Sequence, residues 1–143
     1  MASYNNLDSL YKALGKQIEV SLNKTANDLV ELATKLIWEE FYQQYTPRGS
    51  KNYLPYERTY QLLNSIVRSK IQHSGSTYSV EIYLDPSGIN YKDADAMDVF
   101  MMASEGIHGN QNVQTDGKFF EEFIKETMKS WKILLVKHGL NVV

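Results

Sequence analysis

Cysteine is absent from all 143 residues of the sequence. This absence excludes disulfide frameworks, thiolate zinc sites and cysteine nucleophiles. An excess of charge of one sign is also missing, because 15 basic and 17 acidic side chains leave a net charge of −2. Dedicated nucleic-acid-binding proteins usually carry a basic face and a high pI, so this balance argues against that class.

Long hydrophobic runs are missing as well. The longest unbroken apolar run is Val99–Ala103, which is far too short to span a bilayer. The first residues lack a basic stretch followed by an apolar one, so we predict no secretory signal. We therefore expect a soluble protein that is made in the cytoplasm and does not engage a membrane.

Histidine is sparse, and His73, His108 and His138 fall in different predicted elements without ligand-like spacing. We therefore expect no metal site. No Gly-x-Ser-x-Gly motif is present, and residues 106–109 lack the Lys-Ser/Thr that would complete a phosphate-binding loop. A triad of Ser65, His108 and an aspartate can be imagined, but any chain of this size offers such a trio. We expect no enzymatic activity and no cofactor.

The acidic stretch Asp93–Asp98 resembles the first ligands of a calcium-binding loop. The loop's sixth position requires glycine and its twelfth requires glutamate, and these positions hold Asp98 and Ser104. The start of a helix explains the stretch better, because carboxylates are favoured near the positive end of the helix dipole.

What is present indicates one domain, residues 1–143, with a modest core. Residues 6–45 form one long helical pattern, with Asn5 or Asn6 as its cap. Such a helix would extend roughly 60 Å at about 1.5 Å per residue, so we expect a bend or break at Gly15 or within residues 23–27. Residues 1–25 form either a protruding arm that packs on a neighbouring subunit or part of the same domain.

The middle of the chain predicts a short helix and a hairpin. Tyr56–Ile66 fits a helix with Leu62, Leu63 and Ile66 facing inward. Residues 66–72 and 78–84 are strand-like, and the second alternates apolar and polar side chains as a half-buried strand does. Residues 74–77 join the two strands.

The rest of the chain predicts a turn at residues 85–88 and two more helices. The first covers residues 93–104, and the second runs from about Lys118 to His138, with Gly139 as a left-handed C-cap. The predicted class is α+β: a long N-terminal helix, a small antiparallel hairpin or sheet, a short helix and a long C-terminal helix, with the helices on one face of the sheet.

Tyrosine is frequent, with 10 copies against 5 phenylalanines. Tyrosine suits surfaces that partners bury, although a core that uses tyrosine is an equal alternative. Basic and aromatic residues also alternate between Arg48 and Tyr60, a pattern seen where single-stranded nucleic acid stacks. Glu57 interrupts this short cluster, which favours an exposed loop and helix surface.

The segment Tyr53–Ile66 resembles the tail-completion proteins of long-tailed bacteriophages, also called neck or head–tail joining proteins. Those proteins place a Tyr-x-Arg-Thr-x-x-Leu-x-x-Ser-Ile-like motif between a long helix and a β-hairpin. The matching residues here are Tyr56, Arg58, Thr59, Leu62, Leu63, Ser65 and Ile66. A later Gly-Ile-His-Gly element, matched by residues 106–109, precedes a C-terminal amphipathic helix in both.

The resemblance implies a structural subunit of the virion neck that is not an enzyme and binds no cofactor. Such subunits assemble in the host bacterial cytoplasm into a homo-oligomeric ring, six- or twelve-fold, between the head connector or stopper protein and the tail terminator or tail tube. DNA passes through the ring without specific binding. The candidate interface residues that it indicates are Tyr53, Tyr56, Arg58, Thr59, Tyr60, Ile107 and His108. Arg58 pairs with a carboxylate either in its own subunit or across a ring contact.

Two alternatives stay open at this point. A tail-terminator or head-closure subunit shares the size and the ring habit. A small regulatory or nucleic-acid-binding protein is the reading that the residues between Arg48 and Tyr60 would support.

Overall fold

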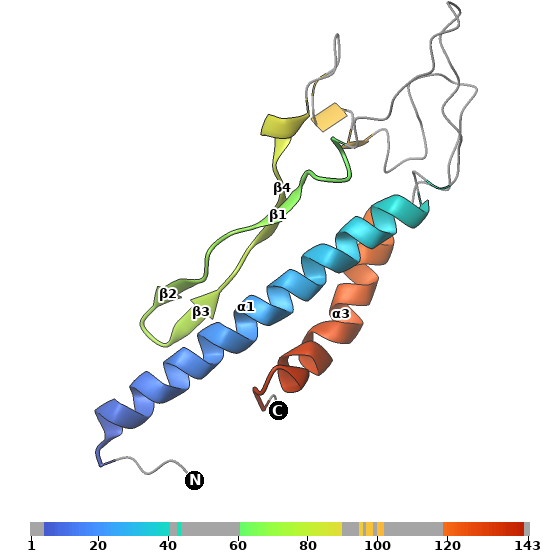
Figure 1. Cartoon of the computed structure of the whole chain (residues 1–143). Helices are drawn as coiled ribbons and strands as arrows, with labels where there is room; N and C mark the ends of the chain where they lie inside the picture. The colour runs from blue at the N-terminus through green and yellow to red at the C-terminus, as the bar shows by residue number, and fades with distance from the viewer. Residues whose placement is uncertain are drawn as a thin grey trace, which may run out of the picture.

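The computed structural model describes residues 5–40, 43, 61–89, 95, 97, 98, 100, 101 and 119–141. Its elements follow in the order α1 (Leu7–Glu40), β1 (Ile66–Arg68), β2 (Gln72–Ser74), β3 (Thr77–Ser79), β4 (Ile82–Leu84), the 3₁₀ turn η2 (Pro86–Gly88) and α3 (Phe119–Lys137). Helix α1 lies between a narrow β-ribbon on one side and α3 on the other (Figure 1). The α+β prediction is confirmed.

Helix α1 begins where the sequence predicts, because the Asn6 side-chain oxygen accepts a hydrogen bond from the Ser9 amide at 2.9 Å. The expected bend or break is wrong, since α1 continues unbroken for 34 residues, a length of about 51 Å (Figure 1). The helix is not interrupted at Gly15, Asn23 or Asn27. These three residues instead contact the ribbon. The Tyr78 hydroxyl approaches Gly15 closely, and both asparagines accept hydrogen bonds from Arg68.

The β-ribbon is a hairpin with an irregularity in the middle. Strand β1 pairs antiparallel with β4, Arg68 opposite Ile82, and β2 pairs with β3, Gln72 opposite Ser79. Three residues, 69–71, therefore face two residues, 80–81, which is the signature of a β-bulge. The sequence predicts one continuous strand over residues 66–72, so the bulge is a correction to that expectation.

The bulge changes which side chains face α1. Arg68 lies on the face of the ribbon that meets α1, and simple alternation would bring Gln72 to the same face. The extra residue brings His73 there instead, where its ring stacks on Tyr78 with centroids 4.2 Å apart. On the other strand the predicted alternation is confirmed, because Tyr78, Val80, Ile82 and Leu84 are each partly buried while the residues between them are exposed.

The turns on both sides of the ribbon follow the sequence. Ser74 and Thr77 pair across a two-residue loop whose first residue, Gly75, has a φ of 59°, a left-handed conformation that glycine adopts without strain. After β4, the Asp85 carboxylate caps η2 and accepts a hydrogen bond from the Ser87 amide at 3.0 Å. Hydrogen bonds from the Ser87 side chain and backbone lower the pKa of the Asp85 carboxyl below its usual value.

Helix α3 ends in the predicted left-handed cap. Gly139 has a φ of 98°, its amide bonds to the Val136 carbonyl, and the Leu140 amide bonds to the Leu135 carbonyl. These two bonds form a Schellman motif, which satisfies carbonyls that the helix end would leave unpaired. Of the helix expected at 93–104, Met97, Asp98, Phe100 and Met101 are helical. Asp95 lies before them outside the helix, and its side chain accepts a hydrogen bond from the Met97 amide at 2.9 Å. The remaining positions lie outside the described residues.

The core gathers at the C-terminal end of α1, where α3 begins. Ile37 and Leu62 each expose only 1% of their surface, and they pack with Ile89, Phe100 and Phe119. Leu36, Leu63, Ile66 and Leu84 close this cluster from the sides. The predicted inward residues Leu62, Leu63 and Ile66 therefore do pack in or against the core. The helix predicted over Tyr56–Ile66 is wrong at residues 61–66, and its positions 56–60 lie outside the described residues. Residues 61–64 form a turn and Ile66 already begins β1, because the Ser65 hydroxyl and amide both bond back to the Leu62 carbonyl.

Candidate functional site

The seven interface residues that the sequence indicates all lie outside the described residues. They are Tyr53, Tyr56, Arg58, Thr59, Tyr60, Ile107 and His108. Their roles therefore stay predictions. The surfaces that the structure does describe are an open groove beside the ribbon bulge, a polar joint at the end of α3, and two exposed apolar stripes.

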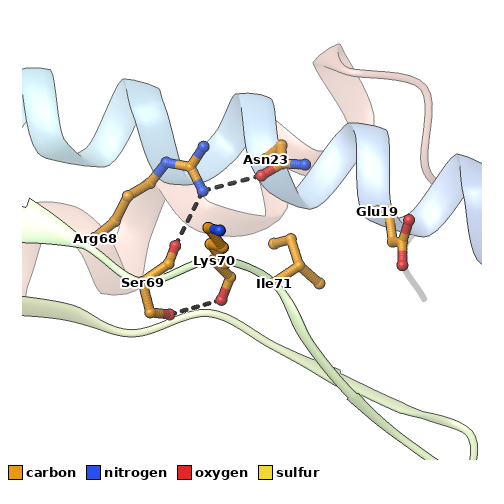
Figure 2. Close-up of a pocket in the computed structure, with 6 residues that line it drawn as sticks. All are labelled: Glu19, Asn23, Arg68, Ser69, Lys70 and Ile71. Carbon is orange, nitrogen blue, oxygen red and sulfur yellow. Dashed lines mark hydrogen bonds between the residues drawn. The ribbon is translucent and has the colours of Figure 1, made fainter.

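The groove lies between α1 and the bulged edge of the ribbon and has a volume of about 420 Å³. Glu19 and Asn23 line it from α1, and residues 68–71 line it from the ribbon (Figure 2). The Arg68 guanidinium donates to the side-chain oxygens of Asn27 at 2.7 Å and Asn23 at 2.9 Å. The two asparagines are four residues apart, so they project from the same face of α1.

The hydrogen-bond partners of Arg68 are neutral amide and carbonyl oxygens. Its third acceptor is the backbone carbonyl of Ser69 at 3.2 Å, and no carboxylate pairs with it within the described part of the chain. Lys70 adds a second positive charge to the same groove. The groove can therefore accept a carboxylate or a phosphate oxygen, since a guanidinium fixed in place binds both well.

The polar joint fixes the C-terminal end of α3 to the middle of α1. The Ser21 hydroxyl donates to the His138 carbonyl at 2.8 Å, and the Gln17 side-chain amide donates to the Gly139 carbonyl. The His138 ring contacts the Asp28 carboxylate at 2.7 Å between Nε2 and Oδ2. The hydrogen bonds of His138 with Ser21 and with Asp28 are both partly buried. Together these contacts hold the end of α3 at one position along α1.

The first exposed stripe lies on the N-terminal turns of α1. Leu7, Tyr11 and Leu14 are exposed by 67%, 66% and 44%, and we call them the arm stripe. Their spacing of three and four residues continues the helix face that is buried further along, at Ala26, Leu29, Ala33 and Ile37. The same face of one helix is thus covered in its second half and uncovered in its first, where α1 extends past the ribbon and α3 (Figure 1).

The second exposed stripe lies on α3. Phe120, Ile124 and Met128 recur every four residues and are exposed by 47%, 47% and 70%. We call them the α3 stripe. The charged residues of α3 occupy other faces of the helix, and four of them form two exposed pairs there, Lys125 with Glu122 and Lys129 with Glu126. Large contiguous apolar patches on protein surfaces commonly mark contacts with other molecules.

The described ranges contain no group of three or more His, Asp or Glu side chains able to hold a metal ion. None of the helices in those ranges is both long and apolar enough to cross a membrane. The described residues present a basic groove and two exposed apolar stripes.

A family model described as YomN matches residues 6–138. The chain belongs to the YomN family. The YomN match begins at Asn6 and therefore includes the arm stripe, the ribbon and α3. No curated protein and no solved structure shows a significant match to the chain.

The sequence predictions missed Arg68 and its two asparagine partners, which were interpreted as a site of helix breakage. A signal was present, because two asparagines spaced four residues apart lie on one face of a helix and form one polar patch there. The sequence did not show which basic residue would meet this patch, since the bulge that determines the register of the ribbon has no clear sequence signature.

Proposed function

We propose that this YomN-family chain is a structural subunit of the neck of a long-tailed bacteriophage, where it forms a ring that joins the head connector to the tail tube around the DNA channel. The observation that carries the proposal is the arm stripe. A helix face that is core in one half and exposed in the other is suited to burial by a neighbouring subunit. An exposed apolar helix face fits a structural subunit that acts by contacting other subunits.

A ring built from one kind of subunit requires two different, complementary faces on each copy, because head-to-tail contacts close by rotation. The arm stripe and the α3 stripe supply two such faces on opposite parts of the molecule. The net charge of −2 also suits a channel through which DNA slides, since tight DNA binding requires many lysines and arginines on phosphates.

The resemblance of Tyr53–Ile66 to tail-completion proteins supplies the location in the virion, with the head connector and the tail terminator or tail tube as partners. Native mass spectrometry of the full chain, alone and mixed with connector and tail-terminator rings, tests this. We expect a ring, or a monomer that assembles on a partner ring. A strictly monomeric chain that binds neither ring contradicts the proposal.

A tail-terminator or head-closure subunit would use the same two stripes for ring contacts but would lie at another level of the neck. Cryo-electron microscopy of the virion separates these roles, because each places the chain at a different height relative to the tail tube.

The basic groove favours one further candidate, a small nucleic-acid-binding protein, because two basic residues, Arg68 and Lys70, line it against one acidic residue, Glu19, among the described residues. A gel-shift titration at low salt tests it, with Arg68→Gln as the matched variant. Retardation that Arg68→Gln abolishes supports nucleic-acid binding, and the absence of any retardation removes this candidate.

A further inference from the structure

The two exposed stripes carry the same charge pattern. In the arm stripe, Asp8 follows Leu7 and Lys12 follows Tyr11. In the α3 stripe, Glu121 follows Phe120 and Lys125 follows Ile124. Each stripe is therefore flanked on the same side by an acid and, one turn later, by a lysine.

The arm cannot reach the α3 stripe of its own copy. Phe119, next to the α3 stripe, packs against Ile37 near the far end of α1. Leu7 lies thirty residues from Ile37 along the unbroken helix, a distance of about 45 Å. The polar joint and the core hold α3 alongside the C-terminal half of α1, so the two stripes of one copy do not meet within the described residues (Figure 1). Phe120 contacts Phe100 of its own copy and still exposes 47% of its surface.

We propose that the arm stripe of one copy packs antiparallel on the α3 stripe of the next copy, with Leu7 opposite Ile124 and Tyr11 opposite Phe120. This contact deepens the proposed ring, on which it rests, by naming its two faces. Apolar ridges spaced by four residues on both helices can interdigitate. The arrangement is heterologous, so it continues from copy to copy until a ring closes.

Charge determines the direction of the contact. When two helices pack antiparallel, the flanks on the same side of their stripes face each other. Asp8 then meets Lys125, and Lys12 meets Glu121. A parallel alignment would place the two charged flanks on opposite edges of the contact. Asp8, Lys12 and Glu121 make no ion pair within the part of the chain that the structure describes, and Lys125 makes only an exposed one with Glu122.

A contact between two arms would also match opposite charges, but it would end at two copies and leave the α3 stripe exposed. The heterologous contact instead buries residues of both stripes, Leu7 and Tyr11 on the arm and Phe120 and Ile124 on α3. This difference gives the experiment two clearly separated outcomes.

Disulfide crosslinking tests the contact, because the natural chain has no cysteine and every disulfide must come from an introduced pair. Full-length Tyr11→Cys is mixed with full-length Phe120→Cys that carries a tag, and the mixture is mildly oxidised. We expect the mixed disulfide to dominate. Lys129→Cys in place of Phe120→Cys is the matched control, because Lys129 is as exposed as the stripe but lies on the charged face of α3.

Charge reversal supplies a second measurement that needs no crosslink. Lys12→Glu should weaken self-association about two- to five-fold, and adding Glu121→Lys should restore it. Tyr11→Ser removes an apolar contact and should weaken association about tenfold or more. Lys12, Glu121 and Tyr11 are exposed in the free chain, so circular dichroism should show unchanged folding.

Several results would overturn the contact. If two copies of Tyr11→Cys form a disulfide with each other as fast as Tyr11→Cys does with Phe120→Cys, the contact is an arm–arm dimer. If Tyr11→Cys crosslinks to Lys129→Cys as efficiently as to Phe120→Cys, the arm does not bind the proposed face of α3. If the natural chain stays monomeric at every concentration, the contact does not form. Rings that form without the mixed disulfide would contradict this contact and leave the neck proposal intact, whereas absence of the chain from the neck in virion maps would contradict that proposal alone.

Discussion

The close approach of β3 to α1 at Gly15 gives a quantitative prediction. A Cβ atom at position 15 would overlap the Tyr78 hydroxyl oxygen and would lie 3.5 Å from the Tyr78 Cζ atom. The first contact requires movement, whereas the second is an ordinary van der Waals contact. The steric cost of a side chain at position 15 therefore comes from a single oxygen atom.

Gly15→Ala changes two opposing terms. Alanine in a helix interior is favoured over glycine by about 0.8–1.0 kcal/mol. Overfilling a packed contact costs about 1–3 kcal/mol, and Tyr78 cannot yield freely because its ring stacks on His73. We expect Gly15→Ala to lower the free energy of unfolding by about 0–2 kcal/mol in the natural chain.

The same change in a Tyr78→Phe background should be stabilising by about 1 kcal/mol, because the overlapping oxygen is gone and the helix preference remains. Tyr78→Phe alone should stay within about 0.5 kcal/mol, since no hydrogen bond to the Tyr78 hydroxyl is seen within the described residues. Urea unfolding of all four proteins yields the coupling energy directly.

Equal effects of Gly15→Ala in the two backgrounds would refute the reasoning. That result would mean that the ribbon tip does not lie on α1 at Gly15. The length of helix that extends beyond the body, and with it the arm stripe, would then have to be defined differently.

Three further predictions concern the core, the groove and pH. Ile37→Ala should lower the free energy of unfolding by about 2–5 kcal/mol in urea titrations, because Ile37 is almost fully buried, whereas the exposed Ile133→Ala should change it by less than about 0.5 kcal/mol. Arg68→Ala should cost about 1–3 kcal/mol through its lost hydrogen bonds, and removing Asn27 as well should add little if the two act as one contact, whereas full additivity would show that they do not. The pKa of Asp85 is lowered on folding, so its carboxylate stabilises the fold above the unfolded value of about 3.8 and this contribution is lost as pH falls through the folded value. The stability difference between the natural chain and Asp85→Asn should therefore shrink on acidification, and a difference that grows would contradict this sign.

Helices α1 and α3, and the alternation of buried and exposed side chains along the second strand of the ribbon, could be predicted from the sequence because local patterns determine them. The apolar spacing of α1, the Asn6 cap and the Gly139 cap depend on neighbours within a few residues. The alternation from Tyr78 to Leu84 has the same local origin. Each of these predictions is confirmed.

The unbroken course of α1 and the bulge could not be predicted, because both depend on contacts across the chain. Gly15 reads as a helix breaker until Tyr78 is known to lie against it. Residues 69–71 read as continuous strand until the pairing partners on the other strand are counted. The groove at Arg68 could not be predicted either, because the bulge forms one of its walls and the unbroken α1 forms the other.

The joint between α1 and α3 also has a consequence for the order of folding. Its contacts connect residues 110 to 122 positions apart, such as Asp28 with His138 and Gln17 with Gly139. Loop-closure entropy must be overcome before such distant contacts form, so they form slowly relative to local structure. During translation, α1 leaves the ribosome long before α3 does, and its apolar face has no cover from α3 until the region around Gly139 has been synthesised. Nascent chains would therefore be the species most exposed to premature association, and a chaperone that binds amphipathic helices would act on this interval.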